Sequence, residues 1–274
     1  YARRKMGETA ADRMSDGALM VIGPVLALAF VASLFHLGTP LNAPRAVINL
    51  GSSWLSREIF FGSLFALSGA VFALMQWRKI GSSTLRMVLA WIAALLGIMF
   101  VYSMAMVYMV PSQPAWNTLF TPVSFFVTTA LLGLFTVGAS YVFNYNYVKE
   151  RDPDCADQQC MLLRGALRGI AVTSILLLGV QLVTITVYLV GLSNMGPAAT
   201  ETARMLAEEY MPLLVLILLF VGAGVLALFL YRNASSPGHE TTMNRLAYAA
   251  FLCIFVGAIV GRYLFYASHV RIGT

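Results

Sequence analysis

Long, uninterrupted apolar runs are the feature that most limits what this sequence can fold into. Each run has about 20 residues with few ionisable side chains, enough for a helix to cross a hydrocarbon core roughly 30 Å thick. The runs are continuous rather than alternating, which excludes a membrane β-barrel. They predict seven membrane-spanning helices, at residues 18–36, 58–77, 86–110, 119–147, 167–193, 210–231 and 245–268.

The composition agrees with a chain whose natural solvent is lipid. Mean hydropathy is +0.78, and 11% of the residues are charged, against about 25% in soluble domains. The loops between the runs are short, so we predict an all-α integral membrane protein with a single helical bundle over residues 1–274. The opening segment YARRKMGETAADRMSDG is typical of a loop between helices, so we expect an eighth helix upstream of it.

The distribution of lysine and arginine predicts the orientation, because cytoplasmic loops of membrane proteins carry the excess of these residues. Thirteen of the 18 lie on one side of the predicted bundle, and four lie on the other: Arg45, Arg57, Arg204 and Arg271. The thirteen basic residues are therefore predicted to be cytoplasmic, and the loop from His36 to Glu58 faces outward, toward the periplasm in a bacterium. The net charge of +6 is ordinary for a basic rim beside anionic lipid and requires no nucleic acid.

The cysteines and histidines predict no metal or haem in this protein. Cys155 and Cys160 lie in a predicted cytoplasmic loop, and two thiolates fall short of the four ligands of a structural zinc site. Cys253 is interpreted as a core residue. His36 and His269 form the only pair that could bind a haem between two helices, and both lie at predicted helix ends. Too few cysteines are present for an iron–sulfur cluster.

Scarce polar residues gather at the outward end of the predicted bundle. His36 ends the first run, Arg45 follows it, and Arg57 with Glu58 opens the second run. Glu58 is predicted to lie in the N-terminal turn of its helix, where the helix dipole favours its anionic form. Each of these residues alone fits a structural role equally well, as a cap, an interface anchor or a side chain that reaches the surface. Together they favour a site.

Two further helices contribute polar residues to the same end. Arg262, Tyr266 and His269 are spaced by four and three residues, which places them on one face of the last helix. Gln181, Thr184 and Tyr188 form a milder polar stripe on the fifth. Intramembrane polar groups are costly and commonly functional, so we predict a shared pocket.

Quinol oxidation is the chemistry that fits such a pocket. A quinol releases two protons and two electrons, and His36 and Glu58 are suitable proton acceptors. Arg45, Arg57, Arg262, Tyr266 and His269 are candidates for binding the quinol oxygens, and the arginines equally for docking a partner subunit. A protein without a redox centre of its own must pass the electrons to a partner docked at the outward end.

The segment SLFHLGTPLNAPRAVINLGSSWLSREIFFGSLF resembles the signature of the membrane-anchor subunits of dimethyl sulfoxide reductase-type molybdoenzymes. In these subunits a helix-ending H-L-G-x-P precedes S-x-E-I at the start of the next helix. The segments MFVYSMAMVY, TPVSFFVTT and GRYLFYASH are similar to later spans of the family. The resemblance places the family's quinol-site histidine on His36 and its essential glutamate on Glu58.

The resemblance implies an eight-helix, haem-free anchor in the bacterial inner membrane that oxidises menaquinol for anaerobic respiration. It also implies an iron–sulfur subunit that docks on the outer face and feeds a molybdopterin catalytic subunit. Two positions depart from the family pattern, because a glutamate is expected near Ala258 and a basic residue near Met106. These departures leave the terminal electron acceptor open.

Two alternatives remain at this point. The same anchor could run in reverse and pass electrons from an outer dehydrogenase to quinone, since one site serves both directions. A secondary transporter is the alternative from another class, although transporters typically have internal repeats and sites near the bilayer midplane. No repeat is visible, and Arg262 is the main charge inside a predicted span.

Overall fold

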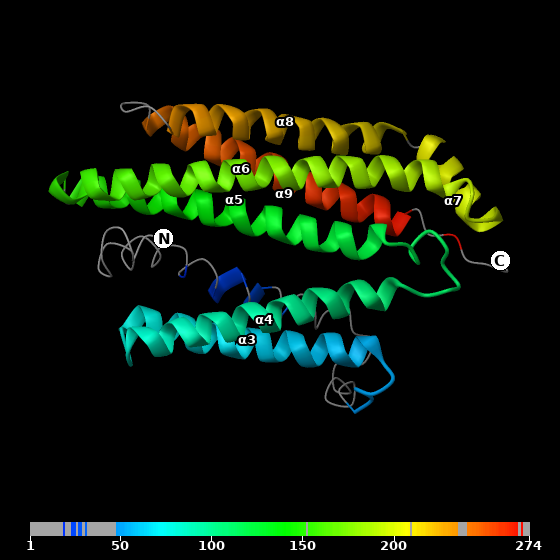
Figure 1. Cartoon of the computed structure of the whole chain (residues 1–274), viewed down its shortest axis with the longest axis horizontal. Coiled ribbons are helices and arrows are strands. Elements are labelled where there is room, and N and C mark those ends of the chain that lie inside the picture. The colour runs from blue at the N-terminus through cyan, green and yellow to red at the C-terminus, as the bar shows by residue number, and fades with distance from the viewer. Residues whose placement is uncertain are drawn as a thin grey trace. The chain divides into compact units, whose positions relative to one another are not determined.

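The computed structural model describes residues 48–151, 153–208, 210–234, 240–267 and 270, with isolated positions between 19 and 31. This part of the protein is helical, with no strand among the described residues (Figure 1). Its helices are α3 (Trp54–Arg78), α4 (Ser83–Tyr108), α5 (Phe120–Arg151), α6 (Pro153–Leu192), α7 (Pro197–Glu208), α8 (Tyr210–Ala234) and α9 (Glu240–Ala267).

Six of these helices are long and apolar enough to cross a membrane: α3, α4, α5, α6, α8 and α9. They confirm the six predicted spans from residue 58 onward, although several ends differ by a few residues. The span predicted at residues 18–36 lies outside the described residues, apart from a few positions that are helical. The protein is thus an all-α multi-pass membrane protein.

The prediction that Cys155 and Cys160 lie in a loop is wrong, because both residues are helical. α5 continues to Arg151 and α6 begins at Pro153, so both cysteines lie in the first turns of a 40-residue helix. Hydropathy hides this extension because the segment is too polar to cross a membrane, yet most of its residues are compatible with a helix. Proline is also favoured at the first helical position, where its missing N–H costs nothing.

The short helix α7 corrects a second prediction. The segment between residues 193 and 210 was expected to be a loop, but Pro197–Glu208 is helical. Gly196 has a φ of 95°, a conformation that glycine adopts readily, and Pro197 then starts the helix. Its buried residues are Ala199, Thr202 and Leu206, spaced by three and four positions. This spacing gives α7 one buried face and one polar face.

The described helices form two compact units, α3 with α4 and α5 with α6 to α9. The single bundle over residues 1–274 therefore stays a prediction. In the first unit, aromatic rings of one helix lie over glycines of the other. A Cβ atom at Gly62 would lie 2.9 Å from the Phe100 ring, and one at Gly97 would lie 3.2 Å from the Phe65 ring. The two rings stack at 6.3 Å, so the glycines allow α3 and α4 to pack closely.

The second unit is a four-helix arrangement in which α5 and α8 each contact both α6 and α9 (Figure 1). Its core includes the fully buried Leu131 and Ile254, together with Phe135 and Phe220. The ring of Phe220 on α8 lies against Gly257 on α9, at 2.9 Å from where a Cβ atom would be. This contact agrees with the close approach expected for small residues between membrane helices.

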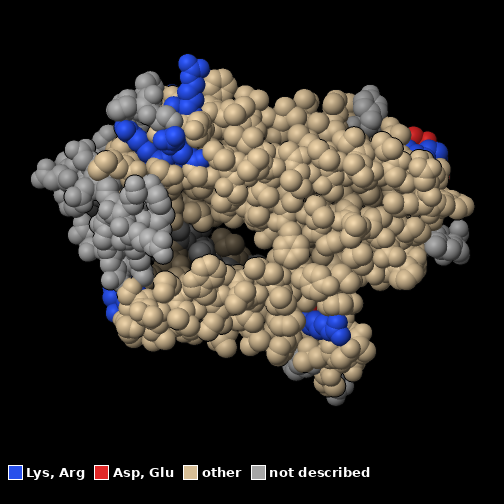
Figure 2. Space-filling model, viewed as in Figure 1, with Lys and Arg blue, Asp and Glu red and all other residues tan. Residues whose placement is uncertain are grey.

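Charged side chains mark the ends of the helices. On the face drawn in Figure 2, Lys, Arg, Asp and Glu are nearly absent from the helical flanks. In the α5–α9 unit, Arg168, Arg232 and Arg245 lie near one end, whereas α7 lies at the other. We call these the basic end and the α7 end of the unit.

The contact between Gly257 and Phe220 makes a stability prediction. Gly257→Ala should destabilise the protein by about 1–3 kcal/mol, because the buried Phe220 ring cannot move without disturbing the core. Gly133→Ala is the matched control on α5, since nothing lies within 4 Å of a Cβ atom there. It should be neutral or stabilising by up to about 1 kcal/mol through helix propensity. Thermal unfolding of the detergent-purified variants measures both, and equal effects would contradict the packing role of Gly257.

Candidate functional site

The start of α3 carries the predicted proton acceptor Glu58. The Ser53 side chain accepts a hydrogen bond from the Ser56 amide at 3.3 Å, so Ser53 caps the helix and Trp54 begins it. Glu58 is then the fifth helical residue and lies in the second turn. Its predicted place in the first turn is wrong, because the helix begins four residues before the apolar run, and the dipole is weaker in the second turn.

Arg57 holds the turn that leads into α3. Its guanidinium donates to the carbonyl oxygens of Leu50 and Gly51, each at 2.8 Å, and lies 4.2 Å from the centre of the Trp54 ring. Trp54 in turn contacts Tyr102 of α4 edge-on at 5.6 Å. Arg57 therefore connects the preceding turn to the first turn of α3.

Glu58 differs from the other described acidic residues because it lies within a membrane span. It is half-buried, and it is the only aspartate or glutamate within the six membrane spans that the structure describes. An ionisable group at such a position is costly and commonly functional. The structure thus leaves Glu58 as the one carboxyl group of these spans that could exchange a proton.

Arg262 and Tyr266 lie one turn apart on α9, as predicted. The Arg262 guanidinium lies 3.5 Å from the centre of the Phe125 ring of α5, and the exposed Tyr266 contacts Trp116 edge-on. The structure therefore places Arg57 and Glu58 together on α3, and Arg262 and Tyr266 together on α9. The other candidates, His36, Arg45 and His269, lie outside the described residues.

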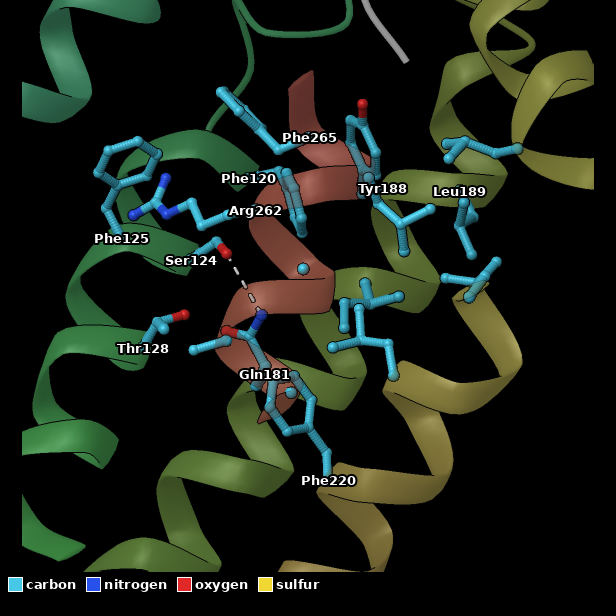
Figure 3. Close-up of a pocket in the computed structure, with 18 residues that line it drawn as sticks. Phe120, Ser124, Phe125, Thr128, Gln181, Tyr188, Leu189, Phe220, Arg262 and Phe265 are labelled. Atoms are coloured by element: carbon cyan, nitrogen blue, oxygen red, sulfur yellow. Dashed lines mark hydrogen bonds between the residues drawn. The ribbon is translucent and has the colours of Figure 1, made fainter. Parts of the chain in front are cut away.

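A cavity of about 60 Å³ lies between the helices of the α5–α9 unit (Figure 3). Its wall is mainly apolar, with aromatic rings from several helices. Its polar lining residues are Ser124 and Thr128 of α5, Gln181 and Tyr188 of α6, and Arg262 of α9. The cavity is thus lined both by Arg262, a candidate from the sequence, and by two residues of the polar stripe predicted on α6, Gln181 and Tyr188.

The polar stripe on α6 differs from the predicted one. Thr184 does not line the cavity, and its hydroxyl donates to the Val180 carbonyl of its own helix at 2.6 Å. The buried polar residues of this face are Ser174, Gln181 and Tyr188, which recur every seven residues. A seven-residue spacing keeps side chains on one face of a helix, and this signal could have revealed Ser174 in the sequence.

Aromatic side chains line the cavity toward the α7 end. The rings of Phe120 and Tyr188 stack at 4.1 Å. Trp116 stacks on Phe265 at 5.1 Å, and its indole N–H donates to the Phe265 carbonyl at 2.9 Å. This bond satisfies a carbonyl of the last turn of α9, which has no partner within the helix. It also ties the segment before α5 to the end of α9.

Ion pairs cover the exposed face of α7. Arg204 donates to Glu201 at 2.9 Å and 2.5 Å, and to Glu208 at 2.5 Å. The hydrogen bonds and charge of Arg204 hold the pKa of Glu201 below its ordinary value. These pairs lie on the polar side of α7, opposite Leu206, which lines the cavity.

The two positions that depart from the family pattern lie in different units. Ala258 lines the α5–α9 cavity, so the space that a longer side chain would occupy there is open. Met106 is half-buried in α4. Within the described ranges, no group of three or more His, Cys, Asp or Glu residues is arranged to hold a metal ion.

The fold and its polar positions define a class: a multi-pass helical membrane protein with one carboxyl group in its described spans. Comparison with known proteins then gives the family. The model of the DMSO reductase anchor subunit (DmsC) matches residues 8–268. The protein belongs to this family of membrane anchors, whose complexes are oxidoreductases of anaerobic respiration.

Two curated relatives show how much of the sequence is shared. The C subunit of the anaerobic dimethyl sulfoxide reductase of Haemophilus influenzae is 30% identical over 258 residues, covering 93% of this protein and 82% of the relative. The subunit of the same name from Escherichia coli K12 is 27% identical over 256 residues, covering 91% and 80%. No solved structure matches this protein.

The contacts of Arg57 predict how the turn before α3 responds to substitution. In Arg57→Ala, hydrogen exchange at the amides of Ser52 and Ser53 should accelerate about 30-fold, because two hydrogen bonds of about 1 kcal/mol each are lost. Arg78→Ala is the control, because Arg78 lies on a tryptophan at the other end of the same helix. Unchanged exchange in Arg57→Ala would show that the turn is held by other contacts.

The ion pairs of α7 make a prediction about pH. Because the pKa of Glu201 is lowered in the folded state, its contact with Arg204 stabilises α7 above the ordinary pKa of 4.5. This stabilisation is lost as the pH falls through the lowered value. Arg204→Gln should raise the pKa of Glu201 toward 4.5, which carboxyl-selective NMR titration measures. A pKa that stays low in the variant would assign the shift to another cause.

Proposed function

We propose that this protein oxidises quinol in the membrane, with His36 and Glu58 as the proton acceptors. The observation that carries the proposal is Glu58, the one acidic residue in the six described spans, within a protein that belongs to the anchor family over residues 8–268. His36 enters the proposal from its sequence position at the end of the first predicted span.

The chemistry of the reaction requires proton acceptors and a partner that takes the electrons. Oxidation breaks both O–H bonds of the quinol and yields a quinone, two protons and two electrons. His36 and Glu58 each accept one proton and release it to the solvent on their side of the membrane. Proton transfer to positioned side chains commonly accelerates a reaction by about 10²–10⁴-fold. The two electrons leave for a partner subunit.

The arginines have supporting roles in this proposal. Arg57 positions the turn before α3 through the carbonyl oxygens of Leu50 and Gly51, and so helps to fix Glu58 one residue further on. Arg45, Arg262, Tyr266 and His269 remain candidates for hydrogen bonds to the quinol oxygens.

The assembly and location follow from the family and the charge distribution. The curated relatives are subunits of anaerobic dimethyl sulfoxide reductases. We propose that this protein likewise anchors an iron–sulfur subunit and a molybdopterin-containing catalytic subunit, with menaquinol as the electron donor. The excess of Lys and Arg at the basic end indicates the cytoplasmic side. The His36–Glu58 loop then lies on the periplasmic side of the bacterial inner membrane, where the partner subunits dock.

The experiment that tests the proposal is a charge-removing substitution of nearly equal shape. Glu58→Gln should lower the rate of menaquinol-analogue oxidation by about 100-fold or more, because the acceptor is lost. His36→Ala should do the same. Glu201→Gln, on the exposed face of α7, is the control and should keep the normal rate.

Assembly is measured alongside the rate. Each variant should still co-purify with the partner subunits and with the wild-type amounts of iron and molybdenum. A normal rate of quinol oxidation in Glu58→Gln would refute the role of Glu58. Loss of the metals together with the rate would mean that Glu58 is required for assembly.

A further inference from the structure

A buried acceptor atom in the α5–α9 cavity calls for a ligand. Gln181 is 3% exposed, and its amide nitrogen donates to the Ser124 hydroxyl oxygen at 3.3 Å (Figure 3). Its carbonyl Oε1 is buried and has no hydrogen-bond partner among the described residues. Buried polar atoms nearly always have a partner, in the protein or in bound water. The free acceptor therefore indicates a hydrogen-bond donor inside the cavity.

The size of the cavity limits what that donor can be. The volume is about 60 Å³. A water molecule requires roughly 10–15 Å³ of such a volume, whereas an engineered cavity that binds benzene has about 150 Å³. The space thus accommodates a few water molecules.

The polar lining fits water as well. A buried water needs two to four polar partners. Ser124 and Thr128 lie one turn apart on α5, on the side of the cavity that faces Gln181, and the Arg262 guanidinium lies past Ser124, beside Phe125 (Figure 3). Arginine is always charged, and a charge at membrane depth is stabilised where water can reach it. An acyl or isoprenoid chain would instead leave the Gln181 oxygen without a partner.

The position of Gln181 along α6 indicates how deep in the membrane the cavity lies. Gln181 precedes Leu192, the last residue of α6, by three helical turns, or about 16 Å along the axis. This distance is roughly half of a 30 Å hydrocarbon core. Water at Gln181 would lie deep within the membrane.

We propose that the α5–α9 cavity binds a cluster of water molecules, one of which donates to Gln181 Oε1. The cluster forms a hydrated polar inlet that extends from the α7 end of the unit toward the middle of the membrane. The inlet lets Gln181, Ser124 and Arg262 exchange hydrogen with solvent. This inference goes beyond quinol oxidation and does not rest on it.

Hydroxyl-radical footprinting tests the proposal, because X-ray pulses generate radicals from bound water that label the nearest side chains. The full-length protein in its native complex is irradiated without quinol, and labelling of Tyr188, which is only 9% exposed, is measured by mass spectrometry. Wild-type Tyr188 should be labelled. Ala258→Leu, which fills the cavity, should reduce this labelling several-fold.

Gly179→Leu is the matched control. It also adds a leucine side chain, but on the exposed side of α6, where nothing lies within 4 Å of a Cβ atom. Labelling of Tyr188 should stay normal in this variant, and labelling of the exposed Tyr266 provides an internal standard in each sample. Absence of label on wild-type Tyr188, or equal labelling in Ala258→Leu, would overturn the proposal.

A second measurement keeps the test decisive if Ala258→Leu does not fold. A high-resolution electron cryo-microscopy map of the wild-type complex should have a water peak within hydrogen-bond distance of Gln181 Oε1. That peak should be lost in Gln181→Leu, which lacks the acceptor. Continuous density for a lipid tail or a quinone ring in the cavity, or a cavity without density, would contradict the proposal.

Discussion

The backbone hydrogen bond is the constraint on which the rest of this structure depends. Within a hydrocarbon core no water satisfies an exposed N–H or C=O group, so each span must form a helix that pairs its own backbone. A protein under this constraint has few places for polar side chains, because each one adds its own desolvation cost. The described spans accordingly hold a single carboxyl group, that of Glu58.

Packing without water explains how the two units are built. Lipid tails are as apolar as the helices, so association depends on close van der Waals contact. Rings over glycines provide that contact twice in the α3–α4 unit, through Phe65 and Phe100, and again in the α5–α9 unit, through Phe220. The α5–α9 unit also contains a small cavity, which is lined by aromatic rings, by the amide of Gln181 and by Arg262. Polar groups thus occur where helix packing leaves room for them.

Hydropathy predicted the spans because membrane helices are selected by the same transfer energy that the scale measures. It missed the start of α6 and all of α7, because polar helices outside the hydrocarbon core carry no such signal. The i, i+4 spacing of Arg262 and Tyr266 predicted that both lie on one face of their helix, and the structure places them one turn apart on α9, because this relation depends on helix geometry alone. The predicted polar stripe on α6 was wrong for Thr184. Its hydroxyl donates to the Val180 carbonyl one turn earlier in the same helix and does not line the cavity. The orphaned oxygen of Gln181 depends on the packing of other helices, and no local pattern could reveal it.

The central claim is that Glu58 takes a proton from quinol, and infrared difference spectroscopy tests it most directly. Spectra recorded as the wild-type complex oxidises a quinol analogue should contain the C=O stretch of a newly protonated carboxyl group. The account predicts that this band is absent in Glu58→Gln, with the complex intact and quinol still bound. The same band in the Glu58→Gln spectrum would assign the proton to another carboxyl group and contradict the account.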